Sequence, residues 1–234
     1  MLVFTIIEMA HKIFIDSSKE EKLYTWNEKE LRSFKDIIIK EKINCRMDDL
    51  FLLSFLRARK FDRERALKLL KSYYSARKRN WDMFNDFNPL AMKEYLDMKM
   101  VGYLQQTDQE GRVLGIGRSC AYPKKTFYDK CLLSKNIGST PIRYKEIHVV
   151  NIGKFAHAFI AAFLPFLPYK IKKRMHFHSS GMESLHKFID PKYLPVEYGG
   201  ELPPFDPTEC NEKLLEYQDF FEEQEKYLAG WPSG

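Results

Sequence analysis

The stretch PIRYKEIHVVN, at residues 141–151, opens the part of the chain that decides its fold. Its last apolar residues, 147–150, make a short run of the kind that predicts a strand buried on both faces. The segment that follows, residues 155–167, is apolar nearly all round, which is typical of a helix that is buried or meets lipid. The stretch therefore begins with a strand and an apolar helix.

The basic sequence KIKKR, at residues 170–174, comes next and leads directly into a second short strand, MHFH, at 175–178. A short helix is predicted at 182–189, and the sequence LPVEYGG at 194–200 closes the stretch. Strands and helices that alternate in this way are typical of an α/β domain.

Three pieces of this stretch resemble the C-terminal half of the CRAL-TRIO lipid-binding domain, and in particular its tocopherol- and retinaldehyde-binding group. They are Pro-Ile-Arg-x-Lys-x-Ile-His-x-x-Asn, Lys-x-x-x-Arg-x-His-x-His and Leu-Pro-x-Glu-Tyr-Gly-Gly, and all three are in register. The resemblance implies one hydrophobic ligand held in an α/β cavity beneath a helical gate. It implies carriage of that ligand between membranes without covalent chemistry, so we expect neither enzyme activity nor a cofactor.

The first part of the chain is expected to be helical. Apolar residues recur at helical spacing, and Asp48 and Asp62 each precede such a segment. The sequence at residues 49–62 also resembles the helical region that precedes the CRAL-TRIO lipid domain. Residues 1–15 are interpreted as a further helix. Residues 211–228 predict an acidic C-terminal helix, which either docks on the basic bundle or faces solvent.

We therefore expect an N-terminal helical region at residues 1–88, an incomplete lipid-binding domain at 89–205, and a C-terminal acidic helix and tail at 206–234. Within the lipid-binding domain, residues 101–107 and 112–117 predict two strands joined by a hairpin-like turn.

One piece of the family pattern is missing. The domain ordinarily carries a helix, an inner strand and another helix before the Pro-Ile-Arg segment, whereas here only residues 136–140 separate Pro141 from the preceding predicted helix. At ordinary element lengths the absent piece is about forty to sixty residues long. We expect a short mixed sheet that lacks one inner strand, unpaired strand edges and poor retention of ligand. A splice form, a truncation and a gene-model error all remain open as explanations.

Composition limits the class of protein. The chain has 234 residues, of which 44% are hydrophobic, and its formal net charge of +6 favours anionic partners. It contains no run of about 18 apolar residues, so no membrane-spanning helix is expected, and residues 1–15 lack the pattern of a signal peptide. Its four cysteines are too widely spaced for a zinc ribbon. We expect a cytoplasmic protein with reduced thiols, peripheral on intracellular membranes.

Paired basic residues indicate a site for an anion. Arg143 and Lys145 are two apart on a predicted strand, and Lys170 and Arg174 are four apart on a helical turn, so each pair shares a face. The resemblance implies that both pairs, with Arg59, line a basic cleft for phosphoinositide headgroups. A solvated basic face is the alternative, and nucleic acid is disfavoured because no nucleic-acid-binding motif occurs. We expect an anionic membrane surface and a hydrophobic ligand as partners, and no obligate protein partner.

The apolar segment at 155–167 corresponds by resemblance to the gate over the ligand cavity. Its candidate gate residues are Phe155, Phe159, Phe163, Leu164, Phe166 and Leu167. A core helix is the alternative interpretation of this segment. For the whole chain, the alternative to ligand transfer is a peripheral protein that docks on anionic lipid, or a truncated product, without a working ligand cavity.

Three histidines raise the question of a metal site. His176 and His178 alternate on one predicted strand, and His148 could lie on its neighbour. A third ligand and a carboxylate with a clear role are both missing, so structural histidines are favoured over a metal site. No Gly-x-Ser-x-Gly sequence or other nucleophile motif occurs, which disfavours a hydrolase.

Overall fold

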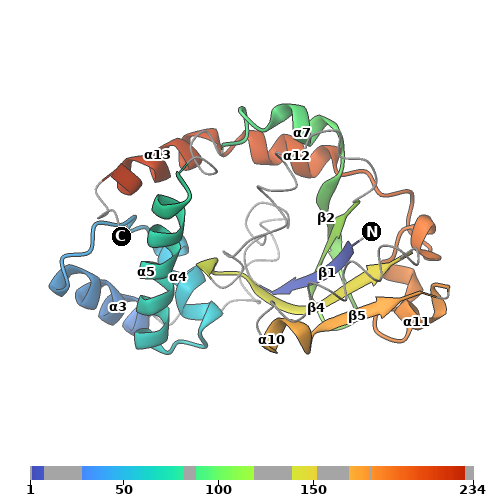
Figure 1. The fold of residues 1–234 in the computed structure, drawn as a ribbon, viewed down its shortest axis with the longest axis horizontal. Coiled ribbons are helices and arrows are strands. Elements are labelled where there is room, and N and C mark those ends of the chain that lie inside the picture. The colour runs from blue at the N-terminus through green and yellow to red at the C-terminus, as the bar shows by residue number, and fades with distance from the viewer. Residues whose placement is uncertain are drawn as a thin grey trace. The chain divides into compact units, whose positions relative to one another are not determined.

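The computed structural model describes residues 2–7, 28–81, 88–118, 139–151, 169–179 and 181–229. These residues form a mixed α/β fold with two compact units, one mainly helical and one built around a sheet (Figure 1). Each unit has a hydrophobic core of its own.

The helical unit contains α3 (Glu28–Lys40), α4 (Asp49–Ala58), α5 (Arg63–Arg79) and α13 (Gln218–Ala229). Two of the helix starts are fixed by aspartates, because Asp48 accepts from the Phe51 amide and Asp62 from the Arg65 amide. The core is a cluster of fully buried apolar and aromatic side chains, which includes Phe34, Ile38, Leu52, Leu53, Phe55, Leu56, Leu70 and Tyr74. The helices predicted on both sides of Asp62 are confirmed.

The acidic C-terminal helix docks on this unit. Phe220 and Tyr227 pack against the helical core, and Leu228 is buried in it. The Arg46 guanidinium lies 3.9 Å from the centroid of the Phe220 ring, and its Nη1 donates to the Phe220 carbonyl at 3.2 Å and approaches Glu223 at 3.0 Å. The single helix predicted at 211–228 is instead two, α12 (Thr208–Leu215) and α13.

The sheet has five strands in the order β2-β3-β1-β4-β5. They are β1 (Leu2–Ile7), β2 (Val101–Thr107), β3 (Val113–Gly117), β4 (Arg143–Val150) and β5 (Met175–His178). The predicted hairpin of β2 and β3 is confirmed, and so are the two strands on either side of the apolar segment. β4 and β5 are parallel, with His148 opposite His176.

The N-terminal strand β1 lies between β3 and β4 and pairs antiparallel with both (Figure 1). The prediction of a helix across residues 1–15 is therefore wrong for Leu2–Ile7. That sequence, LVFTII, is rich in β-branched and aromatic residues, which favour a strand once neighbouring strands are present. The expectation of unpaired strand edges named no strands; among the described strands, β3 and β4 both pair with β1.

Short elements complete the structure: α7 (Lys93–Asp97), α10 (Tyr169–Lys172), α11 (Glu183–His186), and 3₁₀ turns at Pro191–Tyr193 and Val196–Tyr198. The helix predicted at 182–189 is present as α11 but is shorter than predicted. The sheet unit's core combines strand residues with residues that follow β5, namely Leu114, Ile116, Val150, Leu185, Ile189, Leu194, Tyr198 and Phe205. The chain after β5 therefore packs back on the sheet.

Candidate functional site

One of the five predicted basic residues, Arg174, contacts the backbone of β4 at the residue between two others, Arg143 and Lys145. The Arg174 guanidinium donates from Nη1 to the Tyr144 carbonyl at 2.6 Å, and the Ile147 amide donates to the Arg174 carbonyl at 2.8 Å. Arg174 is thereby fixed beside Arg143 and Lys145, which flank Tyr144 in β4. The contact uses one of the five N–H donors of the guanidinium. We call Arg143, Lys145 and Arg174 the basic cluster.

A bulge in β4 changes how this cluster is built. Thr5 of β1 lies opposite Glu146, but the next residue, Ile6, lies opposite Tyr144, so Lys145 is an extra residue in the ladder. A bulge interrupts the strict alternation of side chains and redirects the side chains beside it. The shared face of Arg143 and Lys145, predicted from spacing alone, therefore does not follow from regular strand geometry.

Glu146, the acidic residue of β4, interacts with side chains outside the basic cluster. Its Oε2 lies 3.4 Å from Nη1 of Arg112 and 3.6 Å from Nε2 of His148. Arg112 is buried and donates from Nε to Asp108 at 2.5 Å. The Glu146 carboxylate thus interacts with a buried arginine as well as lying next to the basic cluster in sequence.

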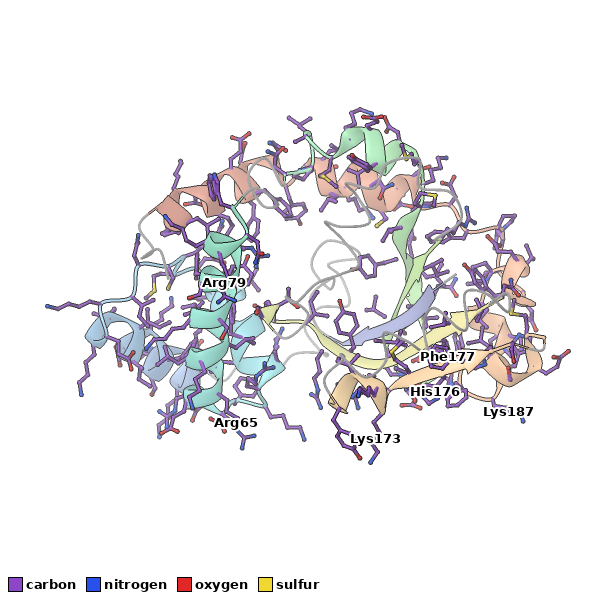
Figure 2. The ribbon with its side chains drawn as sticks, in the orientation of Figure 1. Arg65, Arg79, Lys173, His176, Phe177 and Lys187 are labelled. Carbon is purple, nitrogen blue, oxygen red and sulfur yellow. The ribbon has the colours of Figure 1, made fainter. Side chains whose placement is uncertain are left out.

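The other two predicted basic residues are placed separately. Lys170 belongs to α10, the short helix before β5, and Lys173 lies in the turn between them (Figure 2). Arg59 caps the C-terminus of α4 in the helical unit, where its Nη1 donates to the Ala58 carbonyl at 3.2 Å. Burial, and then the nearby charge of Arg65, lower the pKa of the Arg59 guanidinium. The five residues are thus divided between the two units.

The predicted gate, residues 155–167, lies outside the described residues. The described chain resumes at Tyr169, which is 75% exposed and opens α10. Lys172 and Lys173 follow it directly. An exposed aromatic ring next to lysines is the kind of pairing found at membrane interfaces.

The three histidines form one cluster, as their spacing suggested. His148 lies 5.1 Å from His176 and 5.2 Å from His178, measured between ring centroids, and Phe188 covers all three rings. His148 is fully buried. In the part of the chain that the structure describes, no three His, Cys, Asp or Glu side chains are placed to hold a metal ion.

The closing motif LPVEYGG has a structural role that the sequence did not reveal. Glu197 accepts from the Arg118 guanidinium and, at 2.9 Å, from the Phe205 amide, while Arg118 also donates to the Phe205 carbonyl at 3.1 Å. This clamp ties the end of β3 to the chain beyond the motif. The sequence alone offers no pattern that predicts this clamp beyond the presence of one Arg and one Glu far apart in the chain.

Residues 199 and 200 need to be glycine because neighbouring atoms lie too close to leave room for a side chain. Gly199 has φ of +69°, and a Cβ there would lie 3.0 Å from the His186 ring. A Cβ on Gly200 would lie 1.9 Å from the Leu194 carbonyl oxygen, which accepts from the Leu202 amide. The motif therefore forms a tight turn that admits no side chain at Gly200.

Among the helices that the structure describes, none has the length and apolar character needed to cross a membrane.

Comparison with known proteins gives consistent matches. The family model described as CRAL/TRIO domain matches residues 138–200. The human protein named alpha-tocopherol transfer protein-like is 31% identical over 246 residues, covering 84% of this chain and 72% of that protein. Human clavesin-2 is 30% identical over 222 residues, covering 74% of this chain and 68% of clavesin-2. Rat clavesin-1 is 30% identical over 210 residues, covering 69% and 59% of the two chains.

Proposed function

The chain belongs to the CRAL-TRIO family, and we propose that it binds a small hydrophobic molecule and transfers it between membranes. The observation that carries this proposal is the similarity to the alpha-tocopherol transfer protein-like protein, which extends over 72% of that relative. The ligand class would be tocopherol-like, retinoid-like or phospholipid-like. Such transfer needs complementary apolar surface rather than catalytic groups.

We further propose that β1 takes the place of the inner strand that the family ordinarily supplies from within the domain. The alignment with the human relative runs over 246 residues although it takes in only 84% of a 234-residue chain. The alignment is therefore longer than the part of this chain that it contains. The difference in length agrees with the missing piece of about forty to sixty residues that element lengths predict. The location of β1 between β3 and β4 supports its substitution for the absent strand.

Membrane docking through phosphoinositide headgroups is the third part of the proposal. The donors would be Arg59, Arg143, Lys145, Lys170 and Arg174. The contact between Arg174 and the Tyr144 carbonyl supports it, because it brings the Arg174 guanidinium to the backbone of the residue that Arg143 and Lys145 flank. Phosphate groups favour several convergent donors, which guanidinium groups provide in pairs.

Charge removal at the basic cluster tests the docking. Changing both Arg143→Gln and Lys145→Gln should weaken binding to phosphoinositide vesicles by about thirtyfold, because each charge near anionic lipid is worth about 1 kcal/mol. The measurement is vesicle sedimentation at low and high salt. A matched double variant, Lys187→Gln with Lys226→Gln, removes two exposed charges elsewhere and should bind like the wild type. Equal binding of the wild type to neutral and phosphoinositide vesicles would contradict the docking proposal.

The gate is tested in the same assay. We propose that residues 155–167 cover the ligand and touch the bilayer, with aromatic rings at the acyl boundary and lysines at the headgroups. Changing Phe159→Ser and Phe163→Ser should then weaken vesicle binding while urea unfolding stays close to that of the wild type. Unfolding of this variant would instead identify the segment as core.

A second candidate function is docking on anionic lipid without ligand. The gap in the alignment with the relatives favours it, because the absent helices would otherwise help to wall the cavity. The two candidates differ in whether the purified chain extracts a hydrophobic molecule from vesicles.

A further inference from the structure

The sheet unit contains a buried chain of hydrogen bonds between two histidines and a serine. Nδ1 of His148 lies 3.0 Å from Nε2 of His178, and Nδ1 of His178 lies 2.8 Å from Oγ of Ser184. His148 is on β4, His178 is the last residue of β5, and Ser184 is on α11. The chain therefore joins three elements through two imidazole rings, of which His148 is 0% exposed and His178 4% exposed.

The direction of these hydrogen bonds follows from Glu146. Its carboxylate oxygen lies 3.6 Å from Nε2 of His148, a nitrogen that has no hydrogen-bond partner among the described residues. A carboxylate at that position favours the tautomer with its hydrogen on Nε2, which leaves Nδ1 of His148 as an acceptor. His178 then donates from Nε2 to His148, and Ser184 donates to Nδ1 of His178.

This arrangement limits how many protons the two rings can hold. One added proton can go to Nδ1 of His178, because the Ser184 hydroxyl can turn and accept from it. A second would go to Nδ1 of His148, where an N–H would face the N–H of His178 across 3.0 Å. Two donors at that distance repel each other, so the doubly protonated pair is incompatible with the observed geometry.

We propose that His148, His178 and Ser184 form an acid-sensitive latch, which holds β4, β5 and α11 together with at most one added proton and opens when a second is bound. Opening would free the end of β5, the strand whose other end is tied to β4 by Arg174.

Burial and the neighbouring cationic groups disfavour protonation of the latch. Burial, then His176, His178 and Arg112, lower the pKa of His148 to about 3, and burial followed by His176 lowers the pKa of His178. The other charged groups are Glu146 on β4, and Asp108 and Glu110, which are paired with Arg112 before β3. Since the folded pKa values lie below the ordinary 6.5, the latch is fully stabilising above pH 6.5 and its contribution falls as the solution becomes more acid.

The test compares acid sensitivity in the full chain and in His148→Asn. The asparagine Oδ1 can replace Nδ1 as acceptor but cannot take a proton. Urea unfolding is followed through NMR signals of β4 and β5 between pH 5.5 and 4.5. The unfolding equilibrium constant of the wild type should rise about tenfold more per pH unit than that of His148→Asn, because the variant lacks one titrating group.

Lys187→Gln is the matched control, because it changes an exposed side chain outside the latch, keeps both rings and the Ser184 hydroxyl, and should retain the wild-type pH slope. An equal slope in wild type and His148→Asn would overturn the proposal. If His148→Asn does not fold, NMR titration of the wild-type imidazole rings decides the matter. His148 should remain neutral throughout the folded range, and protonation of both His148 and His178 in folded protein above pH 5.5 would overturn the latch.

Discussion

Phe4→Pro is expected to disrupt the sheet while leaving the helical unit folded. Phe4 lies opposite Gly115 of β3 and Ile147 of β4, so β1 is paired on both sides at this position. Proline removes a backbone donor and is tolerated almost only on edge strands. Each buried hydrogen-bonding group left without a partner costs about 1–3 kcal/mol. A shift of β1 would break its hydrogen bonds to both β3 and β4. The typical total stability of a domain is only about 5–15 kcal/mol.

Hydrogen exchange with mass spectrometry is the appropriate measurement, because it reports on each unit separately. Peptides from β3 and β4 should lose protection in Phe4→Pro, while peptides from α5 keep it. Phe4→Val is the matched control, since it keeps the backbone donor and a strand-forming side chain. Unchanged protection of β3 and β4 in the proline variant would show that β1 is not an inner strand.

Gly200→Ala is the second substitution with a large expected effect. The new Cβ would lie 1.9 Å from the Leu194 carbonyl oxygen and 2.6 Å from the Leu194 Cβ. The contact is with backbone, so a side-chain rotation cannot relieve it. The Leu194 carbonyl accepts from the Leu202 amide, and the Gly200 amide donates to the Pro195 carbonyl, so movement breaks the turn. We expect a loss of about 2–4 kcal/mol in the free energy of unfolding.

Urea unfolding of the sheet unit gives this value. Glu201→Ala, one residue further on, changes an exposed side chain and should stay within about 0.5 kcal/mol of the wild type. A Gly200→Ala variant as stable as Glu201→Ala would mean that the turn is looser than the structure shows.

Local patterns predicted much of this fold. The parallel strands β4 and β5, the hairpin of β2 and β3, and the helix starts at Asp48 and Asp62 each follow from a short sequence with its own periodicity or cap. The histidine cluster was also predictable, because strands on either side of an apolar crossover tend to be neighbours. Each of these features depends on a local pattern or on two strands that follow one another in the same stretch of the chain.

The central position of β1 could not be predicted in the same way. The composition of LVFTII favours a strand, but its place in the middle of the sheet is decided by pairing with strands distant in sequence. The bulge at Lys145 and the clamp between Arg118 and Glu197 have the same origin. A bulge and a long-range ion pair depend on which segments become neighbours in the assembled sheet, so the pattern of one segment does not predict them.

The central claim is that this chain takes up a hydrophobic ligand with β1 in the place of the absent strand, in contrast to the poor ligand retention expected from the missing segment alone. Its most direct test is native mass spectrometry of the full chain after incubation with vesicles containing α-tocopherol, retinaldehyde or phospholipid alone. The claim predicts a monomer that carries one ligand molecule and passes it to acceptor vesicles. A chain that sediments with anionic vesicles but emerges from all three incubations without ligand would contradict it.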